Sequence, residues 1–550
     1  MATSASATAN RQIARAAGTV MLAYALSQVL GLVRWFLMTR YFGAGSDADA
    51  FNAARGFADI LFNLVAGGAL ASAFIPTLTE FLTKEDRPGA WRLVSAVANL
   101  VTLILIGLAL LSALFAPLIV RYLLARGFSP AQQALTVSLL RLMLPSAIIF
   151  GLSGLLMGVL NAHHNFLFPA LASSMYWLGM ILGILILRPS LGIYGPAWGA
   201  VFGAGLHLAI QLPGLLHLPG RKYIPTLGIH LPEVTNVVRL MGPRLFGVAV
   251  VQLNVLVNTN LASAITGGVT IIPLAFAIMT VPLFVMAQGI ATASFPVFSA
   301  QAAAGKFDEM RSSLASTLRG MIFLALPASV GLILLREPLV GFLFERGQFT
   351  HASTLLAAWV LLWYAAGLVG HSVIEVVYRA FYALQNTKTP VLVGAAAMGL
   401  NLAFSFLFKA IFLGVGWEPL GGLALANSVA TALEMCAALF LMRRRLKGLG
   451  GTNLAIGLAQ AAGGSLAMTG GLTLWLGVSS SLSYGAIACG GVLVGAAIYV
   501  LAMLVLRVPE TDQLYQALRR RLPWLPPIHL APTQSRLERA RRRRADHVRR

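Results

Sequence analysis

Residues 92–122 read RLVSAVANLVTLILIGLALLSALFAPLIVRY, and this run settles which class of protein the chain is. Its charged residues, Arg92 and Arg121, lie at its two ends. A helix needs about 20 mostly apolar residues to cross the hydrocarbon core of a bilayer, and this run exceeds that length. Its side chains do not alternate between apolar and polar, so a strand of a closed membrane barrel is excluded. We therefore predict a membrane-spanning helix.

The rest of the chain has the same character. Its 550 residues are 58% hydrophobic and 11% charged, with a mean hydropathy of +0.80, whereas a soluble domain carries about a quarter charged residues. A water-soluble enzyme, a disordered chain, a disulfide scaffold and a coiled coil are therefore excluded. Further apolar runs lie at 18–42, 50–81, 134–160, 166–187, 194–217, 237–265, 271–301, 314–344, 354–384, 390–414, 418–442, 453–478 and 483–506. We predict an all-α polytopic membrane protein with 14 transmembrane helices and no cleavable signal peptide.

Lys and Arg in the loops predict the orientation, because they are enriched on the cytoplasmic side. With the N-terminus inside, the inner segments before the tail hold Arg11, Arg15, Lys84, Arg87, Arg92, Arg221, Lys222, Lys306, Arg311, Lys388, Arg443, Arg444, Arg445 and Lys447. The outer loops hold Arg40, Arg121, Arg126, Arg188, Arg336, Arg346 and Lys409. This bias of 14 to 7 places both termini in the cytoplasm. The net charge of +22 includes a basic tail, which more plausibly contacts anionic lipid headgroups than nucleic acid.

The chain also repeats itself at an offset of 220–221 residues. Pro117-Leu118 recurs as Pro338-Leu339, and Asn165 with Pro169 recurs as Asn386 with Pro390. Each copy contains an even number of spans, so we predict two parallel six-helix repeats around a central cavity, plus two C-terminal helices. The predicted parts are a cytoplasmic N-terminus (1–17), an N-lobe (18–217), a cytoplasmic linker (218–236), a C-lobe (237–446), helices 13 and 14 (453–506) and a basic cytoplasmic tail (507–550).

Polar residues line one face of each of the first two spans. Asn52, Arg55, Asp59 and Asn63 fall within about 80° of one another at 100° per residue. Arg55 and Asp59 are four residues apart and can pair. On the first span Ser27, Gly31 and Arg34 share a face. Ionisable residues inside a membrane usually face a cavity or a protein interior, so two interpretations stay open: a hydrated cavity, or a sealed ion pair that locks the helices together. Arg34 could also snorkel to the interface.

The remaining polar residues do not form the sequence pattern of a catalytic site. There is no phosphate loop for ATP and no Cys/His cluster with metal spacing, so no cofactor and no metal are predicted. Glu434 stands alone in the twelfth span and is either a proton or cation site or a carboxyl neutralised by burial. Glu375 and Arg379 are predicted to form a structural ion pair. Cys436 and Cys489 lie in apolar runs and are predicted to be free, buried thiols.

Several sequence motifs along the chain are informative in combination. The opening motifs are Gly31-Leu32-Val33-Arg34, Phe42-Gly43-Ala44-Gly45, Asp49-Ala50-Phe51, Gly68-Ala69 and Ala73-Phe74-Ile75-Pro76. Later motifs are Met241-Gly242-Pro243, the run from Leu343 to Thr350 (LFERGQFT) and the run from Arg379 to Pro390 (RAFYALQNTKTP). Together these motifs resemble those of one family of transporters, the MurJ (MviN) lipid II flippases, and the resemblance runs from about residue 17 to residue 506.

The resemblance implies the fold of the multidrug/oligosaccharidyl-lipid/polysaccharide exporter superfamily, with helices 13 and 14 forming a groove for the lipid tail. It implies a multi-pass protein of the bacterial cytoplasmic membrane that flips undecaprenyl-diphosphate-linked peptidoglycan precursor to the outer leaflet by alternating access. Possible partners are the cell-wall synthesis machinery. Together with the polar faces of the first two spans, this predicts a substrate-binding cavity lined by Arg34, Arg55, Asp59, Asn63, Ser27, Gln28, Asn52 and Asp49, with Glu434 as the candidate ion-coupling residue.

The chain departs from the family at several cavity positions. Gln28 stands where a further arginine is usual, and Trp35 where an acidic residue is usual. Phe62 with Asn63 replaces a pair of arginines, and Ala277 replaces another. Of the cavity arginines only Arg34 is retained, and Arg55 with Asp59 can partly substitute. Two alternatives therefore stay open: an exporter of another lipid-linked sugar or amphiphile, and a non-transporting scaffold for cell-wall synthesis whose arginine-rich tail is a docking element.

Overall fold

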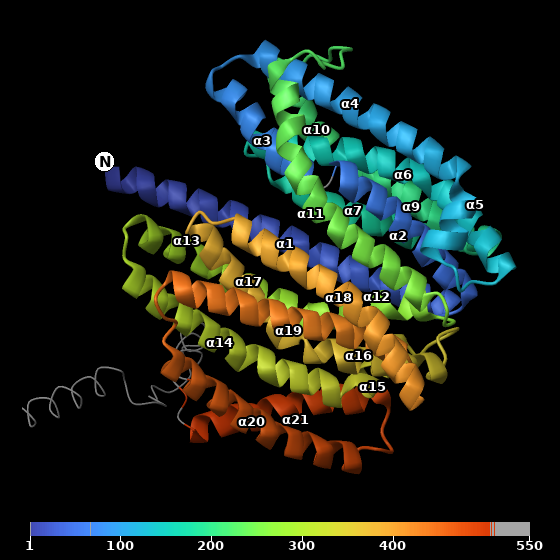
Figure 1. The fold of residues 1–550 in the computed structure, drawn as a ribbon, viewed down its shortest axis with the longest axis vertical. Coiled ribbons are helices and arrows are strands. Elements are labelled where there is room, and N and C mark those ends of the chain that lie inside the picture. Colours follow the sequence, from blue (N-terminus) through green and yellow to red (C-terminus); the bar gives the residue numbers. More distant parts are fainter. Residues whose placement is uncertain (1, 67, 507, 509–510, 512–550) are drawn as a thin grey trace, which may run out of the picture. The chain divides into compact units, whose positions relative to one another are not determined.

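A computed structural model describes residues 2–66, 68–506, 508 and 511 of the chain (Figure 1). All regular secondary structure in these residues is helical, and they contain no strand. This confirms the predicted all-α fold class. They divide into two compact units, and each is described by itself. Unit 1 comprises Met1–Leu274 and Phe344–Ser353, and unit 2 comprises Ala275–Leu343 and Thr354–Arg550.

The helices of unit 1 begin and end at recognisable local signals. Asp86 caps α4 by accepting from the N–H of Gly89 at 2.9 Å, and Ser129 caps α6 by accepting from the N–H of Gln132 at 3.3 Å. The elements are α1 (Ala2–Phe42), α2 (Ser46–Ala66), α3 (Gly68–Thr83), α4 (Arg87–Leu114), α5 (Ala116–Leu118), η1 (Ile119–Leu124), α6 (Pro130–Ala162), α7 (Leu167–Leu182), η2 (Gly183–Leu187), α8 (Arg188–Leu191), α9 (Tyr194–Ala209), α10 (Leu212–Leu216), α11 (Pro232–Ala262) and the start of α12 (Gly268–Leu283).

Glycines bring α7 unusually close to α9. A Cβ atom added to Gly179 would lie 2.2 Å from the Cα of Gly203, and one added to Gly183 would lie 2.5 Å from the Cα of Gly199. Small residues spaced four apart allow such close approach of helices in membranes, where van der Waals packing drives association. The tight α7–α9 pair supports the face of α7 that packs on α1.

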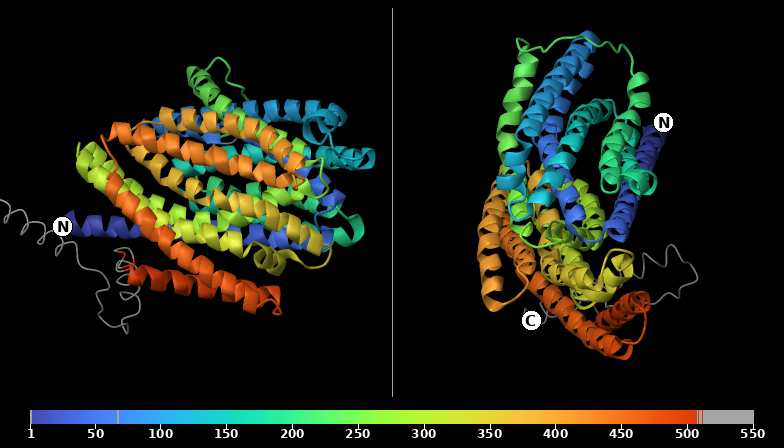
Figure 2. Two further views of the ribbon diagram at one scale, coloured as in Figure 1. Left: turned by 60° about the horizontal axis from the view of Figure 1, so that its bottom comes forward. Right: turned by 90° about the vertical axis from the view of Figure 1, so that its right-hand side faces the viewer.

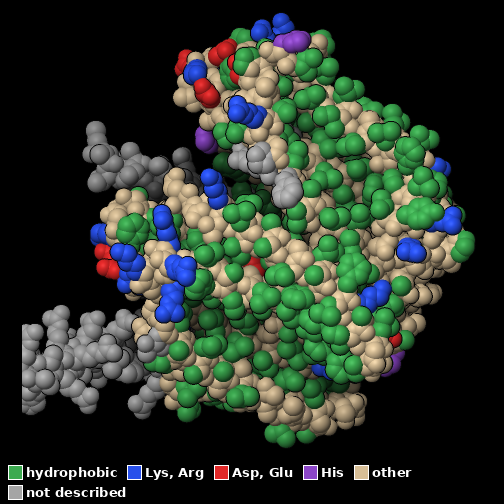
Figure 3. Space-filling model, in the orientation of Figure 1, with side chains coloured by type: hydrophobic (Ala, Val, Ile, Leu, Met, Phe, Trp, Pro, Cys, Tyr) green, Lys and Arg blue, Asp and Glu red, His purple; other side chains and the backbone are tan. Residues whose placement is uncertain are grey.

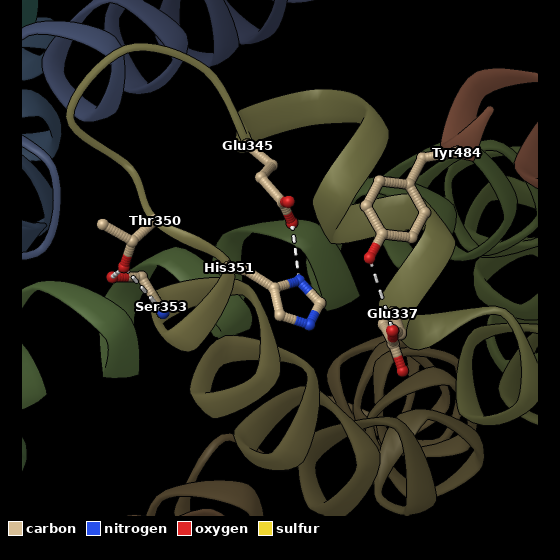
Figure 4. A network of polar contacts seen from close by, with 6 residues as sticks. All are labelled: Glu337, Glu345, Thr350, His351, Ser353 and Tyr484. Atoms are coloured by element: carbon tan, nitrogen blue, oxygen red, sulfur yellow. Dashed lines mark hydrogen bonds and ion pairs between the residues drawn. The ribbon is translucent and has the colours of Figure 1, made fainter.

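Unit 2 contains the remaining helices. They are the rest of α12, η3 (Phe284–Gln288), α13 (Gly289–Ala303), α14 (Phe307–Leu334), α15 (Arg336–Phe344), α16 (His351–Ala366), α17 (Leu368–Ala383), α18 (Lys388–Val415), α19 (Leu420–Arg445), α20 (Gly451–Val478) and α21 (Tyr484–Val505). The helices α20 and α21 run side by side (Figures 1 and 2). Tyr499 of α21 donates to the carbonyl of Phe323 in α14 at 2.7 Å, and Tyr484 donates to Glu337 of α15 at 3.5 Å (Figure 4).

The helices are long and apolar enough for a multi-pass membrane protein. Within the described residues, 11 helices meet this criterion, or up to 13 if each of two bent pairs is one span. The helix α2 falls outside this set, because it carries Asp47, Asp49, Arg55 and Asp59. Hydrophobic side chains cover most of the face shown in Figure 3, and Lys and Arg gather mainly toward its borders. The count of fourteen, the internal repeat and the lobe boundaries stay predictions.

The cysteines correct one expectation. Both are free thiols, as predicted, but Cys436 in α19 and Cys489 in α21 are exposed on the protein surface rather than buried. In an apolar membrane helix the lipid-facing side is as hydrophobic as the packed side, so an apolar run does not indicate which residues other helices cover. The basic tail, residues 507–550, lies outside the described residues apart from Val508 and Thr511.

Candidate functional site

The predicted arginine of the first span is deeply buried in unit 1. The Arg34 side chain in α1 is only 2% exposed, and its guanidinium lies over the rings of Trp35 at 3.9 Å and Trp177 at 5.2 Å. Its Nε and Nη1 atoms have no hydrogen-bond partner among the described residues. Arg34 therefore does not snorkel. A buried donor without a partner costs about 1–3 kcal/mol, so such a site favours an anionic ligand that the protein itself does not supply.

A second arginine is paired. Arg55 Nη1 lies 2.6 Å from Asp59 Oδ2 on α2, which confirms that these two side chains interact. Tyr176 of α7 lies close enough to interact electrostatically with Arg34, Arg55 and Asp59. Two guanidinium groups against one carboxylate leave the group with a net charge of about +1 when all three are ionised. The site is therefore cationic. It contains one ion pair, and aromatic rings line it.

Asp49 and Asn52 lie nearer the start of α2. Their side chains contact residues at the start of α12. The Asp49 side chain is fully buried, and its Oδ2 accepts from the N–H of Gly267 at 2.6 Å. Its Oδ1 accepts from the N–H and the hydroxyl of Thr270 at 2.8 and 2.7 Å. Asn52 Nδ2 donates to Thr270 Oγ1 at 3.1 Å. The Asp49 contacts satisfy N–H groups at a helix N-terminus, so they give this carboxylate a structural role, and Asn52 hydrogen-bonds the hydroxyl of the same Thr270.

The other predicted residues are more dispersed. Ser27 is buried on the same face of α1 as Arg34, whereas Gln28 is exposed and lies about 120° around the helix from Arg34. Asn63 is half-buried near the end of α2. Its neighbour Phe62 packs on Phe150, with ring centroids 5.4 Å apart. The structure thus joins Arg34, Arg55 and Asp59 into one group.

One segment of unit 1 lies between α15 and α16 in the sequence, and most of these two helices belongs to unit 2. Residues 344–353, the docked segment, contact the end of α1: the N–H of Gln348 donates to the carbonyl of Arg40 at 2.9 Å. Gly347 has a φ of 64°, and a Cβ there would lie 2.2 Å from that carbonyl, so no other residue fits without displacement. Within the segment, His351 Nδ1 lies 3.3 Å from Glu345 Oε2 (Figure 4).

Unit 2 contains a separate polar cavity of about 210 Å³ between α17, α18 and α19. Glu434 lines it and accepts a hydrogen bond from Tyr378 of α17. His371 Nε2 lies 3.1 Å from Asn427 Oδ1 in the same cavity. Glu375 lies nearby, and its Oε2 is 2.7 Å from Arg379 Nη1, so that predicted pair forms. Within the described part of the chain, no three His, Cys, Asp or Glu side chains are arranged to hold a metal ion.

Sequence reasoning missed Trp177 and Tyr176. They lie more than 100 residues from Arg34, on an apolar span in which two aromatic residues are unremarkable. The only local signal was Gly31, which lies beside the indole: a Cβ there would be in ordinary van der Waals contact with Trp177 Nε1 at 3.6 Å.

The chain is similar over most of its length to one family of known proteins. The family model described as lipid II flippase MurJ matches residues 38–492. The lipid II flippase MurJ of Burkholderia cenocepacia is 30% identical over 431 residues, covering 76% of this chain and 82% of that protein. A probable lipid II flippase MurJ of Vibrio cholerae is 31% identical over 421 residues, covering 74% and 79%.

Solved structures give the same picture. A lipid II flippase MurJ in an inward closed conformation superposes with a TM-score of 0.76 at 26% identity, covering 88% of this chain and 98% of that one. An inward-facing MATE family multidrug resistance transporter reaches a TM-score of 0.63 at 15% identity, covering 78% and 95%, which shows a shared fold alone. Its match to the family model over residues 38–492 and to these relatives shows that this chain belongs to the lipid II flippase MurJ family.

Proposed function

We propose that this protein is a lipid II flippase, which moves undecaprenyl-diphosphate-linked peptidoglycan precursor from the inner to the outer leaflet of the bacterial cytoplasmic membrane. One observation supports this most directly: Arg34 is buried in a membrane helix with two donor nitrogens, Nε and Nη1, that no described protein group satisfies. A diphosphate that enters a membrane protein loses hydration, and charge-assisted hydrogen bonds from arginine replace it. The site is a transport site, and no catalytic step is proposed for it.

Alternating access requires contacts that form on one side of the membrane and break when the other side closes. The orientation bias predicts that the docked segment and the Asp49–Thr270 contacts lie on the outer side. We propose that both belong to the outer closure of the inward-facing state.

Replacement of a MurJ in living cells tests the function. Cells depleted of their own MurJ should keep growing when this protein is expressed, and lipid II should become accessible at the outer surface. If the protein reaches the membrane but growth and lipid II exposure both fail, another lipid-linked sugar or a scaffold role becomes the better explanation.

We also propose that both termini lie in the cytoplasm and that the basic tail contacts anionic headgroups there, beside the cell-wall synthesis machinery. Single cysteines introduced at positions near Gly220 and Gly448, after Cys436 and Cys489 are replaced, should react with a membrane-impermeant reagent only in inverted membranes. Reaction of either position in intact cells would contradict this topology.

Glu434 is our candidate for ion coupling. The ionisable groups around its cavity are Tyr378, His371 and the Glu375–Arg379 pair, all from α17. If Glu434 takes up an ion during the cycle, Glu434→Gln should make flipping in proteoliposomes insensitive to an imposed H⁺ or Na⁺ gradient. Glu418→Gln, at an exposed position before α19, is the matched control and should respond as the wild type does. An unchanged gradient response of Glu434→Gln would exclude this role.

A further inference from the structure

The contact of Arg34 with two indole rings is unusual for a buried cation. Buried arginines are usually held by a carboxylate, which neutralises the charge and occupies the N–H donors. Here the carboxylate in the neighbourhood, Asp59, is held by Arg55 at 2.6 Å. Arg34 instead has Trp35 at 3.9 Å and Trp177 at 5.2 Å from its guanidinium carbon.

A carboxylate and an aromatic ring leave a guanidinium in different states. A ring attracts the cation through its face, and the N–H donors of the guanidinium point outward in the guanidinium plane. Two indoles can therefore fix the position of Arg34 without cancelling its charge or using its hydrogen bonds. The unpartnered Nε and Nη1 atoms agree with this account.

Both indoles are themselves held in place. Trp35 is 6% exposed and follows Arg34 directly on α1. Trp177 sits on Gly31, one helical turn before Arg34, and its neighbour Tyr176 packs edge-on against Phe150, with ring centroids 4.9 Å apart. The close packing of α7 on α9 fixes the helix that carries Trp177. The rings are thus part of a rigid support rather than a mobile surface.

We infer that Trp35 and Trp177 are positioning residues, which hold the Arg34 guanidinium by cation–π contact and keep its charge and its free N–H donors available for an anionic oxygen of the substrate headgroup. This inference rests on the proposed function. It identifies an anionic oxygen of the substrate headgroup as the group that Arg34 recognises.

The test compares aromatic and aliphatic replacements of Trp177 in the full-length protein. Trp177→Leu should weaken lipid II binding by about threefold to thirtyfold, because it removes the ring that faces the cation. Trp177→Phe should recover part of that loss. Trp198→Leu, on an exposed position of α9, should bind as the wild type does. Equal binding by Trp177→Leu and Trp177→Phe would mean that the residue only packs, and would overturn the inference.

A double-mutant cycle separates the inference from the proposed function. In an Arg34→Ala background, Trp177→Leu should cause no further loss of lipid II binding, because the group that it positions is absent. The same cycle is measured on the thermal unfolding midpoint without any lipid, where the two substitutions should also be non-additive. If the wild type fails to bind lipid II while the unfolding cycle still shows coupling, the proposed substrate fails and the positioning contact stands. Additive effects in the unfolding cycle would overturn the contact itself.

Discussion

Replacing Arg34 with alanine is expected to abolish or cripple lipid II flipping while folded protein remains in the membrane. Removing one charge-assisted hydrogen bond to a diphosphate costs about 1.5–3 kcal/mol, which weakens binding roughly tenfold to a hundredfold. The measurement is lipid II binding and flipping by purified protein in proteoliposomes. Lysine at this position should rescue only partly, because a point charge cannot reproduce the planar fork of arginine.

Arg55 provides the comparison within the same site. Its Nη1 already contacts Asp59, so Arg55→Ala should reduce flipping less than Arg34→Ala. Stability should respond differently from transport. Arg34→Met keeps most of the buried volume and removes two unpartnered donors, so its unfolding midpoint should not fall below that of the wild type. Full transport by the Arg34→Ala, Arg55→Ala double variant would refute this site.

The fold was largely predictable because membrane helices leave a strong local signal. Residues 92–122 correspond to α4, α5 and the start of η1, and the runs at 166–187 and 194–217 match α7 with η2 and α9 with α10. What the sequence could not predict is which side of each helix is covered. Lipid and protein interiors select the same apolar side chains, so Cys436 and Cys489 carry no sign of their exposure.

The site was predictable only where its members lie one or two turns apart. The spacing of Arg55 and Asp59 predicts their ion pair directly, and Arg34 stands out as a charge in an apolar span. Trp177 reaches Arg34 through the packing of α7 on α1, which no local pattern encodes. Asp49 belongs to the same α2 helix as Arg55, but its partners Gly267 and Thr270 lie more than 200 residues away.

Removing the Asp49 carboxylate should lower the stability of the protein, whereas removing the Arg34 guanidinium should not. Asp49→Ala leaves the buried N–H groups of Gly267 and Thr270 without their acceptor. Each such group costs about 1–3 kcal/mol, so we expect a loss of about 2–6 kcal/mol and a clear fall of the thermal unfolding midpoint in detergent. Asp49→Asn should be intermediate, because its amide offers one acceptor oxygen, while its nitrogen would face a second donor.

Asp47→Ala is the matched control for this prediction. Asp47 is exposed, and it shares the first turn of α2 with Asp49, so both substitutions remove the same favourable interaction with the helix N-terminus. Only Asp49→Ala also breaks the contact with α12. An equal, small shift for both variants would show that the Asp49 contacts do not stabilise the fold. A large shift for Asp49 alone, beside an unshifted Arg34→Met, would distinguish a carboxylate that holds α2 against the start of α12 from a cation that remains free for substrate.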